Sequence, residues 1–291
     1  MDTYKTVYDF VTVKKFNDGT EKIYIKKGVL KSKTEEDFER EKSIPQIMTS
    51  IQSANRAFNL LLDLANNNTW QWFITFTFAN DKTGGKRLDD TVVKGLFREW
   101  RHSFKRKLPD MYYIVVPEYH DKGGLHFHGL LGGVTAEDLK LYDSGKVCCH
   151  WVSNGYASRD YFERTKHAHS LNQTDGDIVF NCGAWRYGFS TITAVKSPEA
   201  VKNYVAKYIG KGKIDPRFFN QKRFWASRNI ERPYIEKIKH EIGVVHQFDK
   251  EYTIMRSYLR DMEINLDDYH VEYADDDKYY LILRKKKGEL K

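Results

Sequence analysis

Hydrophobic and polar residues alternate with two different periods along this chain, and each change of period predicts a change of secondary structure. Residues 4–30 alternate loosely on either side of Asn17-Asp18-Gly19, which predicts a β-hairpin. Between Ile47 and Ala65, apolar side chains recur at steps of three and four, which predicts a long helix that ends at Asn66-Asn67-Asn68. A period of two returns over Trp70–Phe78 and predicts a strand.

The middle of the chain continues with elements of both kinds. An apolar stripe with helical spacing predicts a helix from about Asp90 to Lys107. Two alternating runs, Tyr112–Glu118 and Leu125–Leu131, predict strands that are joined by a turn at Lys122-Gly123-Gly124. Residues 132–180 are polar and lack a steady period, so we expect an irregular insertion there.

The last part of the chain is predicted to begin with a strand near residues 185–195 and a helix over about 198–209. Residues 218–291 indicate one or two charged helices and a final hairpin of Tyr269–Tyr273 and Tyr279–Arg284. Strands and helices are mixed along the whole chain without a regular βαβ repeat. The pattern therefore favours an α+β fold with an antiparallel sheet.

Charge and composition narrow the class of protein. The 291 residues include 48 Lys and Arg against 40 Asp and Glu, a formal net charge of +8, which favours a polyanionic partner such as nucleic acid. No stretch approaches the ~18 consecutive apolar residues of a membrane span. The first residues lack the apolar run of a signal peptide, and three cysteines are too few for a disulfide framework. We therefore expect a cytoplasmic protein with no membrane partner.

A His-x-His pair stands within the strand predicted over Leu125–Leu131. The strand period puts His126 and His128 on one face, with Cα atoms about 6.6 Å apart, so both imidazoles can bind one metal ion. Glu118 ends the neighbouring strand and would add a carboxylate. This mixed set of nitrogen and oxygen donors suits Mn²⁺ or Mg²⁺ and could hold Zn²⁺. The alternative is an ordinary pair of surface histidines beside a solvated glutamate.

Two tyrosines lie four residues apart in the helix predicted over 198–209. This spacing puts Tyr204 and Tyr208 on one face of the helix, with Lys207 and Lys211 close by. A phenol with a pKa of ~10 becomes a nucleophile when nearby positive charge lowers that pKa. The set thus indicates a covalent nucleophile that attacks a phosphate, with Lys207 as a catalytic aid. The alternative is that both tyrosines pack in the core.

A cationic stripe at helical spacing runs along the helix predicted over Asp90–Lys107. Phosphate contact by the stripe and by Lys211 is one interpretation, and a solvated helix face is the other. The stripe consists of Lys94, Arg98, Arg101 and Lys105.

Three segments, in this order, resemble the HUH endonucleases, and in particular the rolling-circle replication initiators of the two-tyrosine phage and plasmid type. The strand Phe73–Phe78 resembles the opening motif of that family, and Glu118 with His126-Phe127-His128 resembles its metal motif. The run Tyr204–Lys211 resembles its two-tyrosine signature. The match covers roughly residues 45–232.

The resemblance implies a fold and a reaction. The fold would be a central antiparallel five-stranded sheet of the ferredoxin or RRM-like type, flanked by helices and extended at both ends. The reaction would be a Mn²⁺- or Mg²⁺-dependent nick in single-stranded or hairpin DNA at a replication origin, which leaves a 5′-phosphotyrosine and a free 3′-OH before religation. Tyr204 would then make the first cut, and Tyr208 the second.

The resemblance also implies partners and a division of the chain. A host helicase and polymerase would be needed, in a bacterial cytoplasm, with no small-molecule cofactor. Residues 1–44 would form an N-terminal hairpin or arm, 45–232 the endonuclease domain with an insertion at about 132–180, and 233–291 an accessory region. Alternatives are a transposase- or relaxase-like strand transferase, a His-x-His metallohydrolase, and a nucleic-acid-binding module without catalysis.

Overall fold

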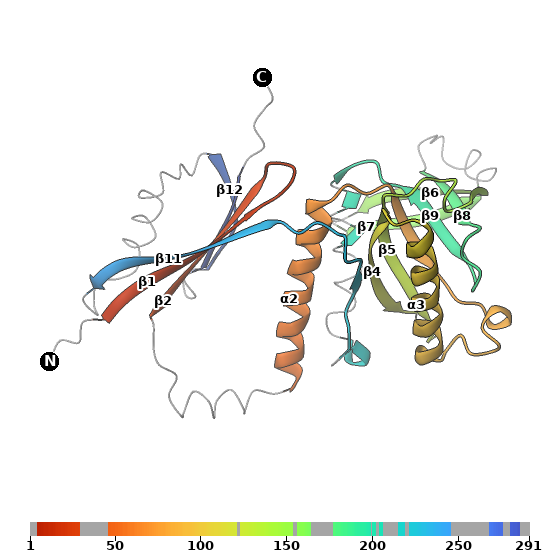
Figure 1. Ribbon diagram of the computed structural model, residues 1–291, viewed down its shortest axis with the longest axis horizontal. Helices are drawn as coiled ribbons and strands as arrows, with labels where there is room; N and C mark the ends of the chain where they lie inside the picture. Colours follow the sequence, from red (N-terminus) through yellow and green to blue (C-terminus); the bar gives the residue numbers. More distant parts are fainter. Residues whose placement is uncertain are drawn as a thin grey trace, which may run out of the picture. The chain divides into compact units, whose positions relative to one another are not determined.

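The protein divides into two compact units, each built around its own sheet (Figure 1). One unit spans Gln46–Glu231, and the other combines Met1–Pro45 with Arg232–Lys291. The computed structural model describes residues 5–29, 46–120, 123–153, 156–163, 177–198, 200–201, 204–205, 215–218, 221–245, 268–275 and 280–285.

The unit formed by the two ends of the chain is a five-stranded antiparallel sheet in the order β11-β1-β2-β13-β12. Its strands are β1 (Lys5–Lys15), β2 (Glu21–Val29), β11 (Tyr234–Val245), β12 (Tyr269–Asp275) and β13 (Tyr280–Lys285). Both hairpins predicted from the sequence are confirmed. The first turns at Gly19, whose φ of 78° favours glycine, while Asp18 Oδ1 accepts hydrogen bonds from the amide and hydroxyl of Thr20.

One prediction for this unit is wrong. Residues 234–245 form the strand β11 and not a charged helix, because the segment pairs along the whole length of β1 and places Ile238 against a small apolar core. That pairing also joins segments near the two ends of the chain in one sheet, although the sequence pattern treats them as separate parts. The remaining charged residues, 246–267, lie outside the described residues.

The larger unit carries the histidine pair and two long helices. Its elements are α2 (Gln46–Asn67), β3 (Trp72–Phe76), η1 (Asn80–Lys82), α3 (Asp90–Lys107), β4 (Tyr112–Tyr119), β5 (Leu125–Gly132), β6 (Leu141–Ser153), β7 (Tyr156–Glu163), β8 (Asp177–Cys182), β9 (Ser190–Ala194), η2 (Pro216–Phe218) and β10 (Trp225–Ala226). The helices and strands predicted between Ile47 and Leu131 are all present. Among the described helices, none combines the length and the apolar character that a membrane span requires.

The sheet of this unit has eight strands, in the order β10-β4-β5-β3-β9-β8-β6-β7, and not five. The described strand pairs are antiparallel, so the α+β prediction holds, but β6, β7 and β8 occupy the region expected to be irregular. A register shift between Asp143 and Lys146, with Gly145 at a φ of 75°, breaks the period of β6. Outer strands also tolerate polar residues on both faces, which removes the alternation that sequence reading depends on.

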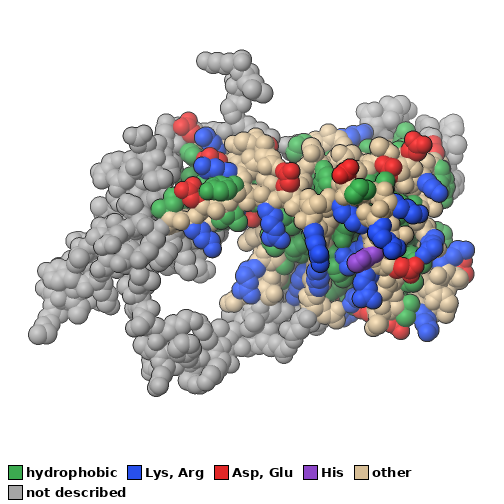
Figure 2. Space-filling model, in the orientation of Figure 1, with side chains coloured by type: hydrophobic (Ala, Val, Ile, Leu, Met, Phe, Trp, Pro, Cys, Tyr) green, Lys and Arg blue, Asp and Glu red, His purple; other side chains and the backbone are tan. Residues whose placement is uncertain are grey.

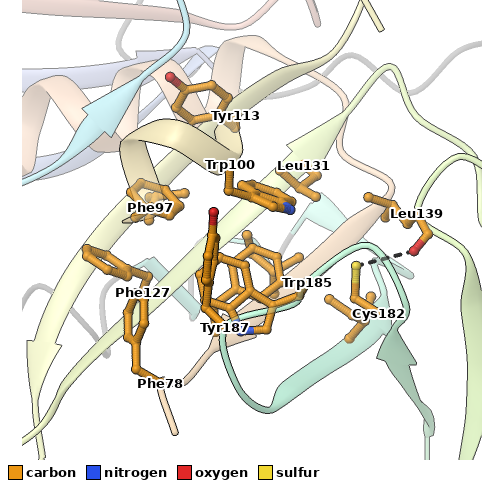
Figure 3. Close-up of a cluster of buried hydrophobic side chains, with 14 of the residues drawn as sticks. Phe78, Phe97, Trp100, Tyr113, Phe127, Leu131, Leu139, Cys182, Trp185 and Tyr187 are labelled. Carbon is orange, nitrogen blue, oxygen red and sulfur yellow. Dashed lines mark hydrogen bonds between the residues drawn. The ribbon is translucent and has the colours of Figure 1, made fainter. Parts of the chain in front are cut away.

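The sheet has two differently covered faces, because side chains alternate along each strand. Helix α3 covers one face with an aromatic core: Phe97 stacks on Phe127 at 4.3 Å between centroids, and Phe76 stacks on Trp185 at 4.4 Å (Figure 3). Cys182 is buried beside this core and donates to the carbonyl of Leu139. Burial raises the pKa of its thiol to about 11.

The other face is covered by α2 and by the segment that contains Tyr204. These elements share one buried cluster with the outward side chains of β3, β4 and β5, and α2 and α3 lie on opposite sides of the sheet (Figure 1). The cluster consists of Leu61, Leu64, Ala65, Trp70, Phe73, Ile114, Val116, Leu130, Val201, Tyr204, Val205 and Ile230. The face that carries this cluster is called the α2 face below.

We predict that Gly129→Ala strongly destabilises this unit. A Cβ at Gly129 would overlap the carbonyl oxygen of Ile114 and lie 2.8 Å from a methyl of Val115, so the two central strands would have to separate. Such overpacking should lower the free energy of unfolding by about 2–3 kcal/mol. Gly95→Ala in α3 is the matched control: nothing lies within 4 Å of its Cβ position, and it should gain up to ~1 kcal/mol of helix propensity. Equal denaturation midpoints for the two variants would contradict the close contact.

Candidate active site

The histidine pair lies on the α2 face of the sheet, near the middle of its strand order. Within β5, Phe127 is fully buried in the aromatic core under α3, while Leu130 belongs to the cluster under α2. Alternation therefore places His126 and His128 on the α2 face, as the sequence predicts. His128 is 6% exposed and His126 is half-buried, with 6.2 Å between their ring centroids.

Glu118 joins the pair across the strand boundary. It is the register partner of His126 in the antiparallel pairing of β4 with β5. Its Oε2 atom lies 2.6 Å from Nε2 of His128, so carboxylate and imidazole form a direct pair. The structure thus brings together the three residues that the sequence singles out as metal ligands.

Thr75 contacts His128 from the opposite side. The two residues are register partners on β3 and β5, and the Thr75 hydroxyl lies 3.0 Å from Nδ1 of His128. A hydroxyl can donate to Nδ1 or accept from it, so Thr75 supports either tautomer of the ring. Nε2 must carry the proton to donate to Glu118, and must lose it to bind a metal. Thr75 is therefore suited to hold His128 in both states.

A third histidine completes the polar group. His120 lies just beyond β4, and its ring stacks on His126 at 5.1 Å between centroids with 21° between planes. Burial is the main cause that lowers the pKa of His126 to about 4, helped by the positive charge that His128, His120 and Arg87 can carry and opposed by Glu118. The His126 ring is therefore neutral at pH 7, which is the form that can bind a metal.

The donor chemistry of this group fits a divalent ion. As the side chains stand, no three His, Cys, Asp or Glu residues among those described are arranged to hold a metal. Glu118 and His128 instead bond to each other at 2.6 Å. Two imidazole nitrogens and a carboxylate on one sheet face are nevertheless the mixed donors that Mn²⁺ accepts and that Mg²⁺ tolerates. A small separation of Glu118 from His128 would give both atoms to one ion.

Tyr204 lies on the same face, with its hydroxyl inserted between two strands. The oxygen donates to the carbonyl of Ile74 at 2.6 Å and accepts from the amide of Gly129 at 3.2 Å. The ring is 6% exposed and packs against Phe73 at 4.6 Å between centroids. Ile74 and Gly129 are register partners, immediately next to the Thr75–His128 pair. The phenol therefore lies beside the histidines but is engaged by the backbone.

The rest of the tyrosine segment is described only in part. Pro198, Ala200, Val201, Tyr204 and Val205 are helical, in agreement with the predicted helix. The other three residues of the two-tyrosine signature that the sequence assigns to the site, Lys207, Tyr208 and Lys211, lie outside the described residues.

The cationic stripe is not brought to the histidines. Lys and Arg side chains gather on the side of the unit that carries α3 (Figure 2), whereas the histidines lie on the α2 face. Arg98 is exposed, but the other three members contact their own chain. Lys94 bonds to Asp90 and Gln221, Arg101 to the hydroxyl of Tyr113, and Lys105 to the carbonyls of Pro109 and Met111. Those three side chains hold loops in place, and DNA contact by the stripe stays a prediction.

Sequence reasoning missed three residues of the site: Thr75, His120 and Arg87. Two carried a usable signal, because Thr75 shares the strand period with Phe73, and His120 follows Glu118 by one period of two. Arg87 comes from an irregular loop, where no period places a side chain.

Comparison with known proteins gives a match to one family model. The model of the family Replication-associated protein ORF2 matches residues 71–213, a range that includes β3, Glu118, both histidines and both tyrosines. No curated protein and no solved structure matched the chain. The match supports a role in replication, of the kind that Rep-type initiators have.

Proposed function

We propose that this protein is a DNA endonuclease and strand transferase that initiates rolling-circle replication by a tyrosine attack on single-stranded origin DNA. One observation carries the proposal: Glu118, His126, His128 and the helical segment of Tyr204 occupy one face of one sheet, with the Tyr204 hydroxyl in the register pair next to His128. The family match supports the replication part of the proposal.

The site residues divide the chemistry between them. Glu118, His126 and His128 would hold Mn²⁺ or Mg²⁺, which when bound neutralises charge on a phosphodiester oxygen. Thr75 orients the His128 ring, and the sheet fixes both imidazoles. The tyrosine oxygen loses its proton to solvent and bonds to phosphorus. The bond from phosphorus to the 3′ oxygen breaks, and that oxygen leaves as a 3′-OH after gaining a proton.

We assign the nucleophile to Tyr208 and a structural role to Tyr204. The Tyr204 oxygen is buried and engaged by Ile74 and Gly129, so it is not presented to a phosphate. Strand β9 ends opposite Trp72, and the next segment has come back to Ile74 by Tyr204, in the direction of Thr75. A further helical turn advances about 6 Å in that direction. This supports Tyr208 at the histidines, with Lys207 and Lys211 supplying positive charge.

The proposed partners follow from the chemistry. A linked 5′-phosphotyrosine preserves the energy of the broken bond, so a later 3′-OH can reverse it and religate the strand. The free 3′-OH primes a polymerase. The sequence contains no Gly-x-x-x-x-Gly-Lys-Ser/Thr loop, so strand separation would depend on a host helicase.

Incubation with a 5′-labelled single-stranded oligonucleotide pool and Mn²⁺ tests the proposal. We expect a protein–DNA adduct that survives denaturant and is absent without the metal. Metal-dependent cleavage without an adduct would instead indicate a metallohydrolase. Retention of DNA without cleavage would indicate a binding module.

We predict that Thr75→Val weakens metal binding while leaving the three ligands in place. The valine side chain has nearly the same volume but can neither donate to nor accept from His128 Nδ1. Loss of such a supporting hydrogen bond should lower Mn²⁺ affinity by about 10- to 100-fold. Thr75→Ser keeps the hydroxyl and should restore most of the affinity. Calorimetric titration with Mn²⁺ measures both variants, and equal affinities would remove Thr75 from the site.

A further inference from the structure

The space beside the histidines contains a cation that no sequence pattern indicates. Gly124, His126 and His128 stand at alternate positions of one extended segment and therefore share the α2 face. A Cβ on Gly124 would lie 3.1 Å from Nη1 of Arg87. The guanidinium of Arg87 thus fills the place of a side chain at position 124, about 6.6 Å along the strand from His126.

The loop that precedes α3 holds Arg87 in this position. Leu88 packs over the same turn, with its Cδ2 atom 3.9 Å and 3.8 Å from the Cβ positions of Gly123 and Gly124. The Asp89 amide donates to the Lys86 carbonyl at 3.0 Å, and the Asp89 side chain caps α3. Arg87 is half-buried, and within the described part of the chain no acidic side chain forms an ion pair with it.

The charge of Arg87 reaches the site. It is among the groups that lower the pKa of His126, after burial, His128 and His120. A guanidinium presents a planar set of N–H donors that matches two oxygens of a phosphate. Carbonyl or amide ligands would not need a cation next to two imidazoles, whereas a phosphodiester brings the negative charge that this cation complements.

We propose that Arg87 binds a backbone phosphate of the single-stranded DNA held at His126. This inference rests on the proposed function and adds the residue that positions the strand. One guanidinium nitrogen pair contacts the phosphate oxygens, and the aliphatic part of the side chain stays against Gly124. The absence of a side chain at Gly124 provides the room.

The test measures DNA binding without metal, so that cleavage does not enter. Affinity for a labelled single-stranded oligonucleotide is measured against salt concentration for the wild type, Arg87→Gln and Arg87→Lys. Loss of one phosphate contact should reduce the slope of log K against log salt by about 0.7 and weaken binding about 10-fold in Arg87→Gln. Arg87→Lys keeps the charge and should keep the wild-type slope.

Lys86→Gln is the matched control, because Lys86 is exposed on the same loop and carries the same charge. Its slope should stay at the wild-type value. An equal loss of slope in Lys86→Gln and Arg87→Gln, or no loss in Arg87→Gln, would overturn the proposal. In the nicking assay, wild-type cleavage with an unaffected Arg87→Gln variant would reject Arg87 and keep the proposed function. Salt-dependent binding through Arg87 without any wild-type cleavage would reject the endonuclease and keep the phosphate contact.

Discussion

His126→Ala should reduce the rate of DNA nicking by about 10³-fold or more while the protein stays folded. The imidazole is half-buried on the α2 face, belongs to neither hydrophobic core, and is one of two histidines that can bind the same ion. Removing a ligand takes away the charge that stabilises the transition state at phosphorus. Single-turnover cleavage of a labelled oligonucleotide in Mn²⁺ measures the loss.

The control for this prediction is His102→Ala, since His102 is exposed on α3, on the other side of the sheet. It should cleave at the wild-type rate. Thermal unfolding should give nearly equal midpoints for both variants and the wild type. A His126→Ala protein that nicks at a near-normal rate would remove the metal assignment, and the whole catalytic proposal would then lack its centre.

Tyr208→Phe should abolish the covalent protein–DNA adduct, whereas Tyr204→Phe should still form it. The Tyr204 hydroxyl bridges the Ile74 carbonyl and the Gly129 amide between β3 and β5, so its removal affects the sheet and not the attacking oxygen. Loss of a partner for these buried groups should lower the free energy of unfolding by about 1–3 kcal/mol. Denaturing gels of the adduct and chemical denaturation of each variant separate the two effects.

The opposite outcome would be informative in a specific way. A Tyr204→Phe protein of unchanged stability that makes no adduct would show that the Tyr204 phenol leaves its place between the strands to react. A Tyr208→Phe protein that makes the first cut but does not complete strand transfer would restore the order in which Tyr204 cuts first. Assays run well below the unfolding midpoint of Tyr204→Phe keep a stability loss from being read as a catalytic one.

The local sequence is sufficient wherever one element is bounded by its own residues. The limits of α3 at Asp90 and Lys107 are those that the apolar stripe predicts, and Asp89 caps the helix by accepting from the amides of Thr91 and Val92. His126 and His128 share a face because alternation is a property of any extended strand. The register of Glu118 with His126 follows from the short turn between two such strands.

The features that the sequence pattern misses depend on partners distant along the chain. Segment 234–245 becomes a strand because β1, more than 200 residues earlier, supplies its hydrogen bonds. Strands β6 to β8 extend the sheet although their polar residues show no steady period. Local propensity carries no information about such pairing, because the stabilising contacts arise only when the distant strand is present.

For the site, the sequence by itself determined which residue types stand together: two histidines and a glutamate on neighbouring strands, followed by paired tyrosines. Only the tertiary structure decided how each side chain is engaged. It placed the Tyr204 hydroxyl between Ile74 and Gly129 and the guanidinium of Arg87 over Gly124. Period and spacing fix the direction of a side chain within its own element, whereas its hydrogen-bond partners depend on how separate elements pack.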